Sequence, residues 1–237
     1  MSQSFTPPSS VSLARPRVRA IVALRLLEVL REQDRPGEIM EEEDPTVTLP
    51  RRFGLSDVVE RQIRTHREDV RRGVRLSDAE IRDLFRLVIR RPDAEEVFHR
   101  VGRVLAGEGR VAGPWFRRLP RLLAYAVARS RTRKKLRRLF GRNVGAFGRG
   151  FFTLEGRGLP FIEADPGGDA CAFLTGFCHA VLAGGGGEGA RVRHTLCQSR
   201  GDEICRWEGE MVEGVELALR EEEDSQETAD MEVERDG

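Results

Sequence analysis

Apolar residues recur every three or four positions along most of the first 140 residues, and this spacing predicts a series of amphipathic helices. The clearest case is residues 15–34, where apolar positions from Val18 to Leu30 form one helical stripe. Ser77 followed by Glu80 has the spacing of a capping box, which marks the start of another helix. The predicted helices cover residues 15–34, 56–73, 76–91, 92–109 and 114–140, the last broken near Pro120.

The pattern changes after residue 144. Residues 145–164 are apolar and interrupted by glycines, which predicts two short strands joined by a turn at residues 155–158. Residues 167–187 form a helix that ends in a run of glycines, and residues 191–212 alternate across a turn as a hairpin does. The sequence therefore predicts an α+β fold, in which a helical N-terminal half packs with a small antiparallel β-sheet unit of order β-β-α-β-β.

Four segments follow from these patterns. Residues 1–15 are rich in serine and proline and are expected to form a flexible leader. Residues 16–144 are the helical region, and residues 145–215 are the α+β unit, which we expect to form one domain with it. Residues 216–237 are rich in acidic residues and contain few large apolar side chains, so they are expected to be a disordered tail.

Two features of the sequence bear on where in the cell the protein is expected. No apolar run reaches the roughly 18–20 residues needed to cross a bilayer, and the N-terminus lacks the apolar core of a secretory signal. We therefore expect a cytoplasmic protein without a membrane span, in which thiols stay reduced.

The net charge is +1, but basic and acidic residues are concentrated in different parts of the chain. Residues 110–149 contain no acidic side chain. The basic run at residues 129–138 has no interleaved aromatic residue, so it favours a solvated helix face over nucleic-acid binding. The acidic tail or the acidic loop at residues 41–44 could pair with this face.

The four cysteines all lie in the final third of the chain, and no C-x2-C pair is present. Cys171, His194, Cys197 and Cys205 could still form a closed tetrahedral site of the Cys3His type. Residues three apart on a straight strand point to opposite faces, so His194 and Cys197 could share a metal only through a bulge or a turn. The alternative is that these cysteines are small buried apolar residues, and spacing alone favours that interpretation.

Two neighbouring residues, Cys178 and His179, lie outside this set. Cys178 is two helical turns from Cys171 and is expected to be a core residue. His179 could be a spare ligand or a pocket donor, although a histidine with ordinary hydrogen-bond partners is the simpler interpretation.

A family resemblance strengthens the metal hypothesis. Cys171, Gly176, Cys197, the Gly201–Asp202 pair and Cys205 follow one another as in the C-terminal part of the 4-vinyl reductase domain family, which residues 145–212 resemble. In zinc-bearing members three cysteines and one glutamate hold the metal, and His194 stands at the glutamate position. The resemblance therefore implies a structural zinc ion at Cys171, His194, Cys197 and Cys205.

The same resemblance suggests several functions. Such domains occur in proteins linked to bacteriochlorophyll synthesis and in the effector-binding part of phenol-responsive transcription activators, and they resemble subunits of a vesicle-tethering complex. The resemblance implies a homodimer and a small apolar or aromatic ligand. We therefore expect a non-enzymatic sensory or regulatory domain; a reductase or accessory factor of tetrapyrrole metabolism and a tethering scaffold are the alternatives.

Residue patterns support binding more than catalysis. No G-x-G-x-x-G loop stands between a strand and a helix, and no G-x-S-x-G, H-E-x-x-H or Walker-type loop occurs. A ligand is expected among aromatic side chains near the helix and strands of the α+β unit, although these could equally form a packed core. The candidates are Phe151, Phe152, Phe173 and Phe177.

Overall fold

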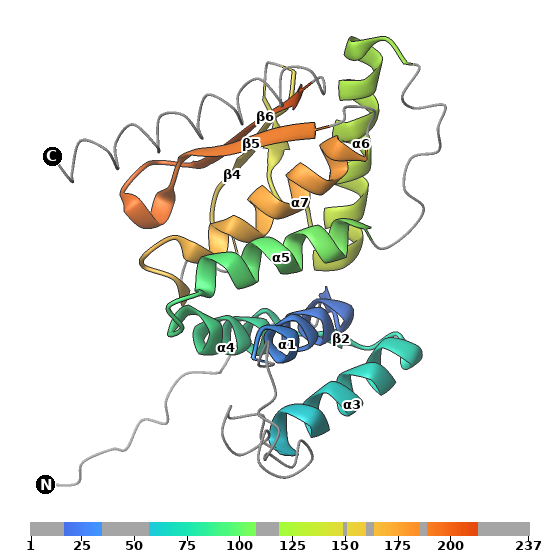
Figure 1. Cartoon of the computed structure of the whole chain (residues 1–237), viewed down its shortest axis with the longest axis vertical. Coiled ribbons are helices and arrows are strands. Elements are labelled where there is room, and N and C mark those ends of the chain that lie inside the picture. Colours follow the sequence, from blue (N-terminus) through green and yellow to red (C-terminus); the bar gives the residue numbers. More distant parts are fainter. Residues whose placement is uncertain are drawn as a thin grey trace, which may run out of the picture.

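The computed structural model confirms an α+β fold (Figure 1). It describes residues 17–34, 57–107, 119–148, 151–159, 164–184 and 189–212. The expected leader at residues 1–15 and the expected tail at residues 216–237 lie outside these ranges. No helix within the described ranges combines the length and the apolar character that crossing a bilayer would require.

Helices dominate the first half and strands the last third of the described chain. The elements in chain order are β1 (Val18–Arg19), α1 (Ile21–Gln33), α3 (Asp57–Arg72), β2 (Arg75–Leu76), α4 (Asp78–Ile89), α5 (Ala94–Gly107), α6 (Arg121–Phe140), β3 (Ala146–Phe147), β4 (Thr153–Gly156), α7 (Ala172–Ala183), β5 (Gly189–Leu196) and β6 (Cys205–Val212). A short 3-10 turn precedes α7 at Asp169–Cys171, and another follows β5 at Gln198–Arg200.

Two of the helices, α4 and α6, begin or end at the capping, proline or glycine residues that mark helix ends in the sequence. The Ser77 side chain accepts a hydrogen bond from the amide of Glu80, whose carboxylate accepts one from the amide of Ser77, which completes the capping box of α4. Pro120 precedes the first residue of α6, and Gly141 ends this helix in a left-handed conformation with φ 65°.

The molecule is built in layers (Figure 1). α7 covers one face of the main sheet, and α5 packs against α7 on the side away from the sheet. α1 and α4 lie beyond α5, α3 packs against α1, and α6 stands beside α7 and the sheet. One cluster of buried apolar side chains runs from Val18 through these helices to Met211, so the helical region and the sheet share a core.

The main sheet has the strand order β3-β4-β6-β5, and all neighbours are antiparallel. Together with α7 these strands give the predicted order β-β-α-β-β. Along β6, Cys205, Trp207 and Met211 are buried, whereas Glu208 and Glu210 face the opposite, open side. The sheet is therefore covered by α7 on one face and polar on the other.

The expected turn at residues 155–158 was misplaced. β3 and β4 are connected through the residues between Phe147 and Thr153, and Glu155 and Gly156 belong to β4. Glycines lie on both sides of β4, so the positions of the glycines alone fit a turn either before or after this strand. The contact between the rings of Phe147 and Phe152, with centroids 5.2 Å apart, favours the earlier turn. A second antiparallel pair, β1 with β2, was not predicted, because two-residue strands have no alternation to detect.

The closest helix contact joins α5 to α7 and depends on two glycines. A Cβ atom at Gly102 would lie 2.0 Å from the carbonyl oxygen of Phe173, and one at Gly176 would lie 2.0 Å from that of His99. Either atom would overlap with backbone, which cannot move aside as a side chain can. The two helices therefore approach backbone to backbone.

We expect Gly102→Ala to lower the free energy of unfolding by about 3 kcal/mol, because the new methyl group forces α5 and α7 apart. The matched control is Gly107→Ala at the end of the same helix, where a Cβ atom has no neighbour within 4 Å. That substitution should change the free energy of unfolding by less than about 1 kcal/mol. Urea titration followed by circular dichroism measures both; equal effects would contradict the close approach.

Candidate metal centre

Four ligand-type side chains from three elements converge at one end of the sheet. The sulfur atoms of Cys171, Cys197 and Cys205 and a ring nitrogen of His194 all lie within 4.8 Å of one another. The three cysteines are buried and free, and His194 is half-buried. Cys171 ends the 3-10 turn before α7, His194 lies in β5, Cys197 directly follows β5, and Cys205 opens β6. The structure thus brings together the four predicted donors.

A β-bulge allows His194 and Cys197 to face the same point. His194 pairs with Trp207, but Leu196 pairs with Arg206, so Thr195 is the extra residue on β5. The 3-10 turn that starts after Cys197 bends the chain further, and it ends at Gly201 with φ 104°. The sequence required a bulge or a turn for this geometry, and the structure contains both.

Backbone hydrogen bonds hold the turn that carries Cys197. The amide of Cys197 donates to the Oδ2 of Asp202 over 2.7 Å, and the amide of Asp202 donates to the carbonyl of Cys197 over 3.1 Å. The amide of Gln198 donates to the sulfur of Cys205 over 3.3 Å. An amide hydrogen directed at a sulfur stabilises the thiolate, which is the metal-binding form.

The loop before α7 holds the cluster from the opposite side. The buried carboxylate of Asp165 accepts hydrogen bonds from the amides of Gly167, Gly168 and Ala170, over 3.2, 2.9 and 2.6 Å. Gly168 has φ 91°, and a Cβ atom there would lie 2.9 Å from the sulfur of Cys197. A glycine is therefore needed both for the backbone conformation and for the space beside the sulfur.

His194 is oriented by Trp207, its partner across the strands. The two rings stack with centroids 4.7 Å apart and planes 11° from parallel. The Nε2 atom of His194 is buried and has no hydrogen-bond partner in the described part of the chain. A buried imidazole nitrogen without a partner is costly unless something binds it, and a metal ion satisfies that need.

The thiols of Cys171 and Cys205 are in hydrogen-bond contact with each other. The sulfurs of Cys171 and Cys205 lie 4.0 Å apart, far beyond the roughly 2.05 Å of a disulfide. This contact lowers the pKa of Cys205, and the neighbouring imidazole of His194 and the amide of Gln198 act in the same direction. The same contact, together with burial, raises the pKa of Cys171. The amide of Gln198 thus favours the thiolate form of Cys205.

Distances in the cluster suit a tetrahedral ion. With metal–sulfur bonds of about 2.3 Å, two sulfurs of a tetrahedral zinc site lie about 3.8 Å apart. The 4.0 Å between Cys171 and Cys205 and the 4.8 Å limit for the whole set need only small movements to reach that geometry. Four protein donors leave no open position for a substrate, so such a site is structural.

Cys178 and His179 lie outside the cluster, on α7. Cys178 is fully buried, as expected for a core residue, and burial raises the pKa of its thiol. His179 faces His99 of α5 with ring centroids 6.1 Å apart, and burial lowers the pKa of both imidazoles.

The four phenylalanines considered for ligand binding lie in two places. Phe173 and Phe177 are fully buried, stack at 6.3 Å and belong to the shared core. Phe151 is 61% exposed, and it lines a pocket of about 390 Å³ with Phe152. The other lining residues are Arg121, Tyr125, Thr153, Arg191, Arg193, Glu208, Gly209 and Glu210, so the pocket lies between α6 and the open face of the sheet.

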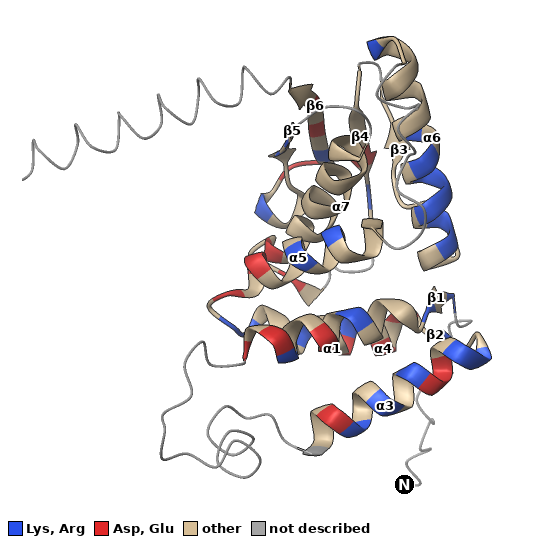
Figure 2. Cartoon of the chain, turned by 45° about the vertical axis from the view of Figure 1, so that its right-hand side comes forward, with Lys and Arg blue, Asp and Glu red and all other residues tan. Residues whose placement is uncertain are grey.

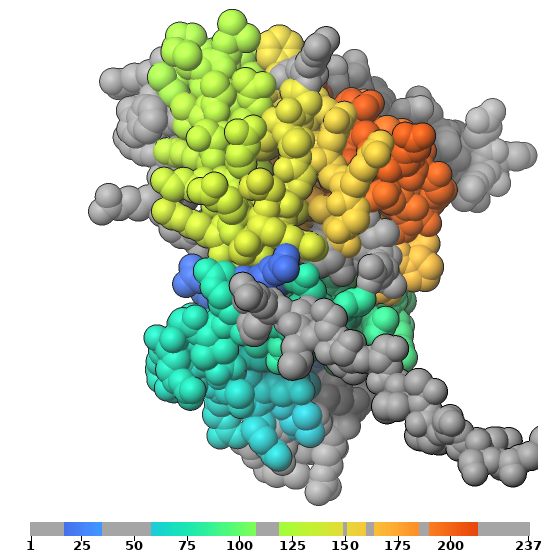
Figure 3. Space-filling model, turned by 180° about the vertical axis from the view of Figure 1, so that it is seen from behind, coloured from blue at the N-terminus to red at the C-terminus, as the bar shows by residue number. Residues whose placement is uncertain are grey.

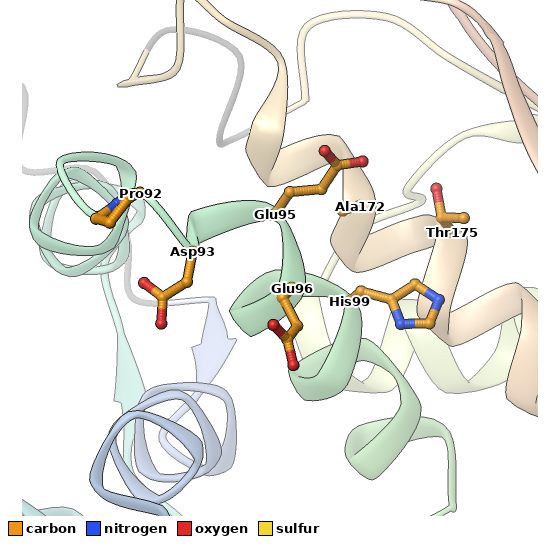
Figure 4. A pocket seen from close by; sticks show the side chains of 7 residues that line it. All are labelled: Pro92, Asp93, Glu95, Glu96, His99, Ala172 and Thr175. Atoms are coloured by element: carbon orange, nitrogen blue, oxygen red, sulfur yellow. The ribbon is translucent and has the colours of Figure 1, made fainter. Parts of the chain in front are cut away.

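A second hollow lies between the start of α5 and α7 (Figure 4). It measures about 620 Å³ and is open to solvent. Figure 4 shows the side chain of His99 pointing toward Thr175, while the carboxylates of Asp93 and Glu96 lie farther out along the rim. In the sequence the paired carboxylates Glu95 and Glu96 have the spacing of an ordinary solvated helix face, and nothing marks His99 as their neighbour in a hollow.

The position of Gly168 can be tested through the reactivity of the thiols. We expect Gly168→Ala to raise the rate at which Cys197 is alkylated by iodoacetamide about tenfold or more, because the methyl group displaces the sulfur from its buried site. Gly201→Ala is the matched control, since Gly201 also has a positive φ but a Cβ atom there has no neighbour within 4 Å. It should add backbone strain of about 1–2 kcal/mol and leave Cys197 protected. Equal alkylation rates in the two variants would contradict the steric role of Gly168.

No protein-family model, no curated protein and no solved structure matches the chain. Function is therefore inferred from the donor atoms, the pocket and their surroundings.

Proposed function

We propose that Cys171, His194, Cys197 and Cys205 bind one zinc ion with a structural role. The observation that carries this proposal is the convergence of three buried sulfurs and one imidazole nitrogen within 4.8 Å. Thiolates and imidazole in a tetrahedral arrangement favour zinc over calcium or magnesium, which prefer oxygen ligands. With three thiolates and a neutral imidazole the bound site carries a net charge of −1.

Surrounding groups fit an anionic site of this kind. The amide of Gln198 already donates to the sulfur of Cys205, and the Arg200 side chain donates to the carbonyl of Gly167 beside the cluster. The ion would link the start of α7 to both strands of the β5–β6 hairpin. Because such a site does not exist in the unfolded chain, the binding free energy would add to the stability of the fold.

Native mass spectrometry of protein purified without added metal or chelator tests this proposal. We expect one zinc ion per chain, its loss in Cys205→Ala, and a lower unfolding temperature in that variant. Cys178→Ala is the matched control, because it removes a buried cysteine of α7 that lies outside the cluster.

Cys178→Ala should lose stability through the cavity that it leaves but should keep one zinc ion. Four alkylatable thiols and no metal in the wild-type protein would exclude the zinc site. Retention of zinc in Cys205→Ala would exclude this ligand set.

We further propose that the chain is a non-enzymatic domain that binds a small aromatic molecule for a sensory or regulatory purpose. The pocket beside Phe151 supports this proposal, because it combines an exposed aromatic ring with several charged side chains in one concavity. The buried ring of Tyr125 lies 5.4 Å from that of Phe151, so it supports the exposed ring on which a planar ligand would stack. The resemblance to the 4-vinyl reductase domain family also supports this role, since the Cys3His cluster occupies the motif positions.

The fluorescent aromatic sulfonate 1-anilinonaphthalene-8-sulfonate is a suitable probe of this pocket. We expect Phe151→Ala to weaken its binding roughly two- to tenfold, which corresponds to the loss of one aromatic contact of about 0.5–1.5 kcal/mol. Leu87→Ala on α4 is the matched control, because Leu87 is similarly exposed, at 59%, and does not line the pocket. Similar losses in both variants would show that the probe binds nonspecifically and would argue against a ligand site at Phe151.

A further inference from the structure

The second half of α6 carries a strongly basic face. Arg133, Lys134, Arg137 and Arg138 are all exposed, and we call these four residues the basic face. In Figure 2 the blue side of α6 turns away from the sheet, and Figure 3 shows the surface of this helix open from behind. No acidic residue occurs in α6. The face is thus a continuous positive surface.

Little in the described part of the chain neutralises this charge. Arg133 lies over the ring of Phe147 at 5.7 Å, which is a cation–π contact with no negative charge. Lys134, Arg137 and Arg138 form no ion pair with any described residue. Like charges three and four positions apart on a helix repel one another, as Lys134 does with Arg137 and Arg138. An anionic partner would therefore stabilise this part of α6.

The chain itself contains a segment of matching charge. Of the sixteen residues from Glu221 to Asp236, nine are acidic and only Arg235 is basic. We call residues 221–236 the acidic segment. The positive charge of the basic face and the negative charge of the acidic segment partly cancel, which helps to explain why the whole chain has a net charge of only +1.

Chain length allows the acidic segment to reach the basic face. β6 leads the chain to the N-terminal end of α6, where the amide of Met211 donates to the hydroxyl of Tyr125 over 2.9 Å and Arg121 donates to the carbonyl of Met211 over 3.0 Å. From Tyr125 to Arg137 the helix rises about 18 Å, at about 1.5 Å per residue. The nine residue steps from Val212 to Glu221 span up to about 30 Å when extended. The segment can therefore lie along α6 without any change in the described fold.

We propose that the acidic segment docks on the basic face of α6 of the same chain. Docking of this kind masks the basic face and makes its access to other anions dependent on displacing the segment. The proposal is independent of the zinc site and of the aromatic pocket.

Zero-length carbodiimide crosslinking provides a direct test, because the chain has only two lysines, Lys134 and Lys135, and both lie on α6. We expect digestion and mass spectrometry to identify isopeptide bonds between Lys134 and carboxylates of residues 221–236. Their yield should fall about fivefold or more between 0.05 and 0.5 M salt, since exposed charges are screened at the higher ionic strength. Lys134→Arg should abolish these bonds while keeping the charge.

The sequence offers a matched control, because the tetrapeptide EEED occurs both at residues 41–44 and at residues 221–224. We would replace each in turn by QQQN and measure the salt concentration at which the protein elutes from immobilised heparin, a polyanion. Neutralisation of residues 221–224 should expose the basic face and raise that concentration, whereas the same change at residues 41–44 should leave it unchanged.

Three results would overturn the proposal. Crosslinks from Lys134 to residues 41–44 in place of 221–236 would identify another occupant. Crosslinks that join isotope-labelled to unlabelled chains would show docking between copies. Equal heparin elution of the two neutralised variants and the wild-type protein would show that the acidic segment does not cover the basic face.

Discussion

The backbone contact between α5 and α7 is the constraint on which the rest of the structure depends. α7 packs on α5 and on both long strands, so it joins the helical region to the sheet. Gly102 and Gly176 allow this contact, because any side chain at either position would meet a carbonyl oxygen of the other helix. The position of α7 then determines where Cys171, at its N-terminal end, meets the β5–β6 hairpin.

The cluster of Cys171, His194, Cys197 and Cys205 connects the N-terminal end of α7 to the β5–β6 hairpin, so the position of α7 also affects the position of the hairpin. Three of its donors come from the hairpin of β5, the turn and β6, and one comes from the residue before α7, so the four together link the hairpin to α7. Two carboxylates support it from either side: Asp165 organises the loop before α7, and Asp202 organises the turn after β5. Both act through backbone amides, which hold the sulfurs in place without adding a charged ligand.

Much of this arrangement could be predicted from the sequence, and the parts that could not be predicted have a physical reason. Long helices were predictable because their apolar stripes repeat many times, and the capping box of α4 is a local signal. The four donors could be named, and the need for a bulge followed from the alternation of a strand. The contact of Gly102 with α7 could not be predicted, because its partner lies more than 70 residues away and glycine leaves no pattern. The pocket at Phe151 and the role of Asp165 were also hidden, since each depends on how separate loops fold against the sheet.

β6 connects the pocket and the cluster within a single strand. Gly209 lines the pocket, and four residues earlier Cys205 contributes its sulfur to the cluster. The amide of Gly209 donates to the carbonyl of Phe152 over 2.9 Å, and a Cβ atom at Gly209 would lie 2.5 Å from Leu182 of α7 and 2.9 Å from the ring of Phe152. If a ligand displaced Phe152, both β6 and α7 would therefore have to shift, because a packed core has little free space. Since Cys171 directly precedes α7 and Cys205 opens β6, a metal at the cluster would resist such a movement and keep the strand in register.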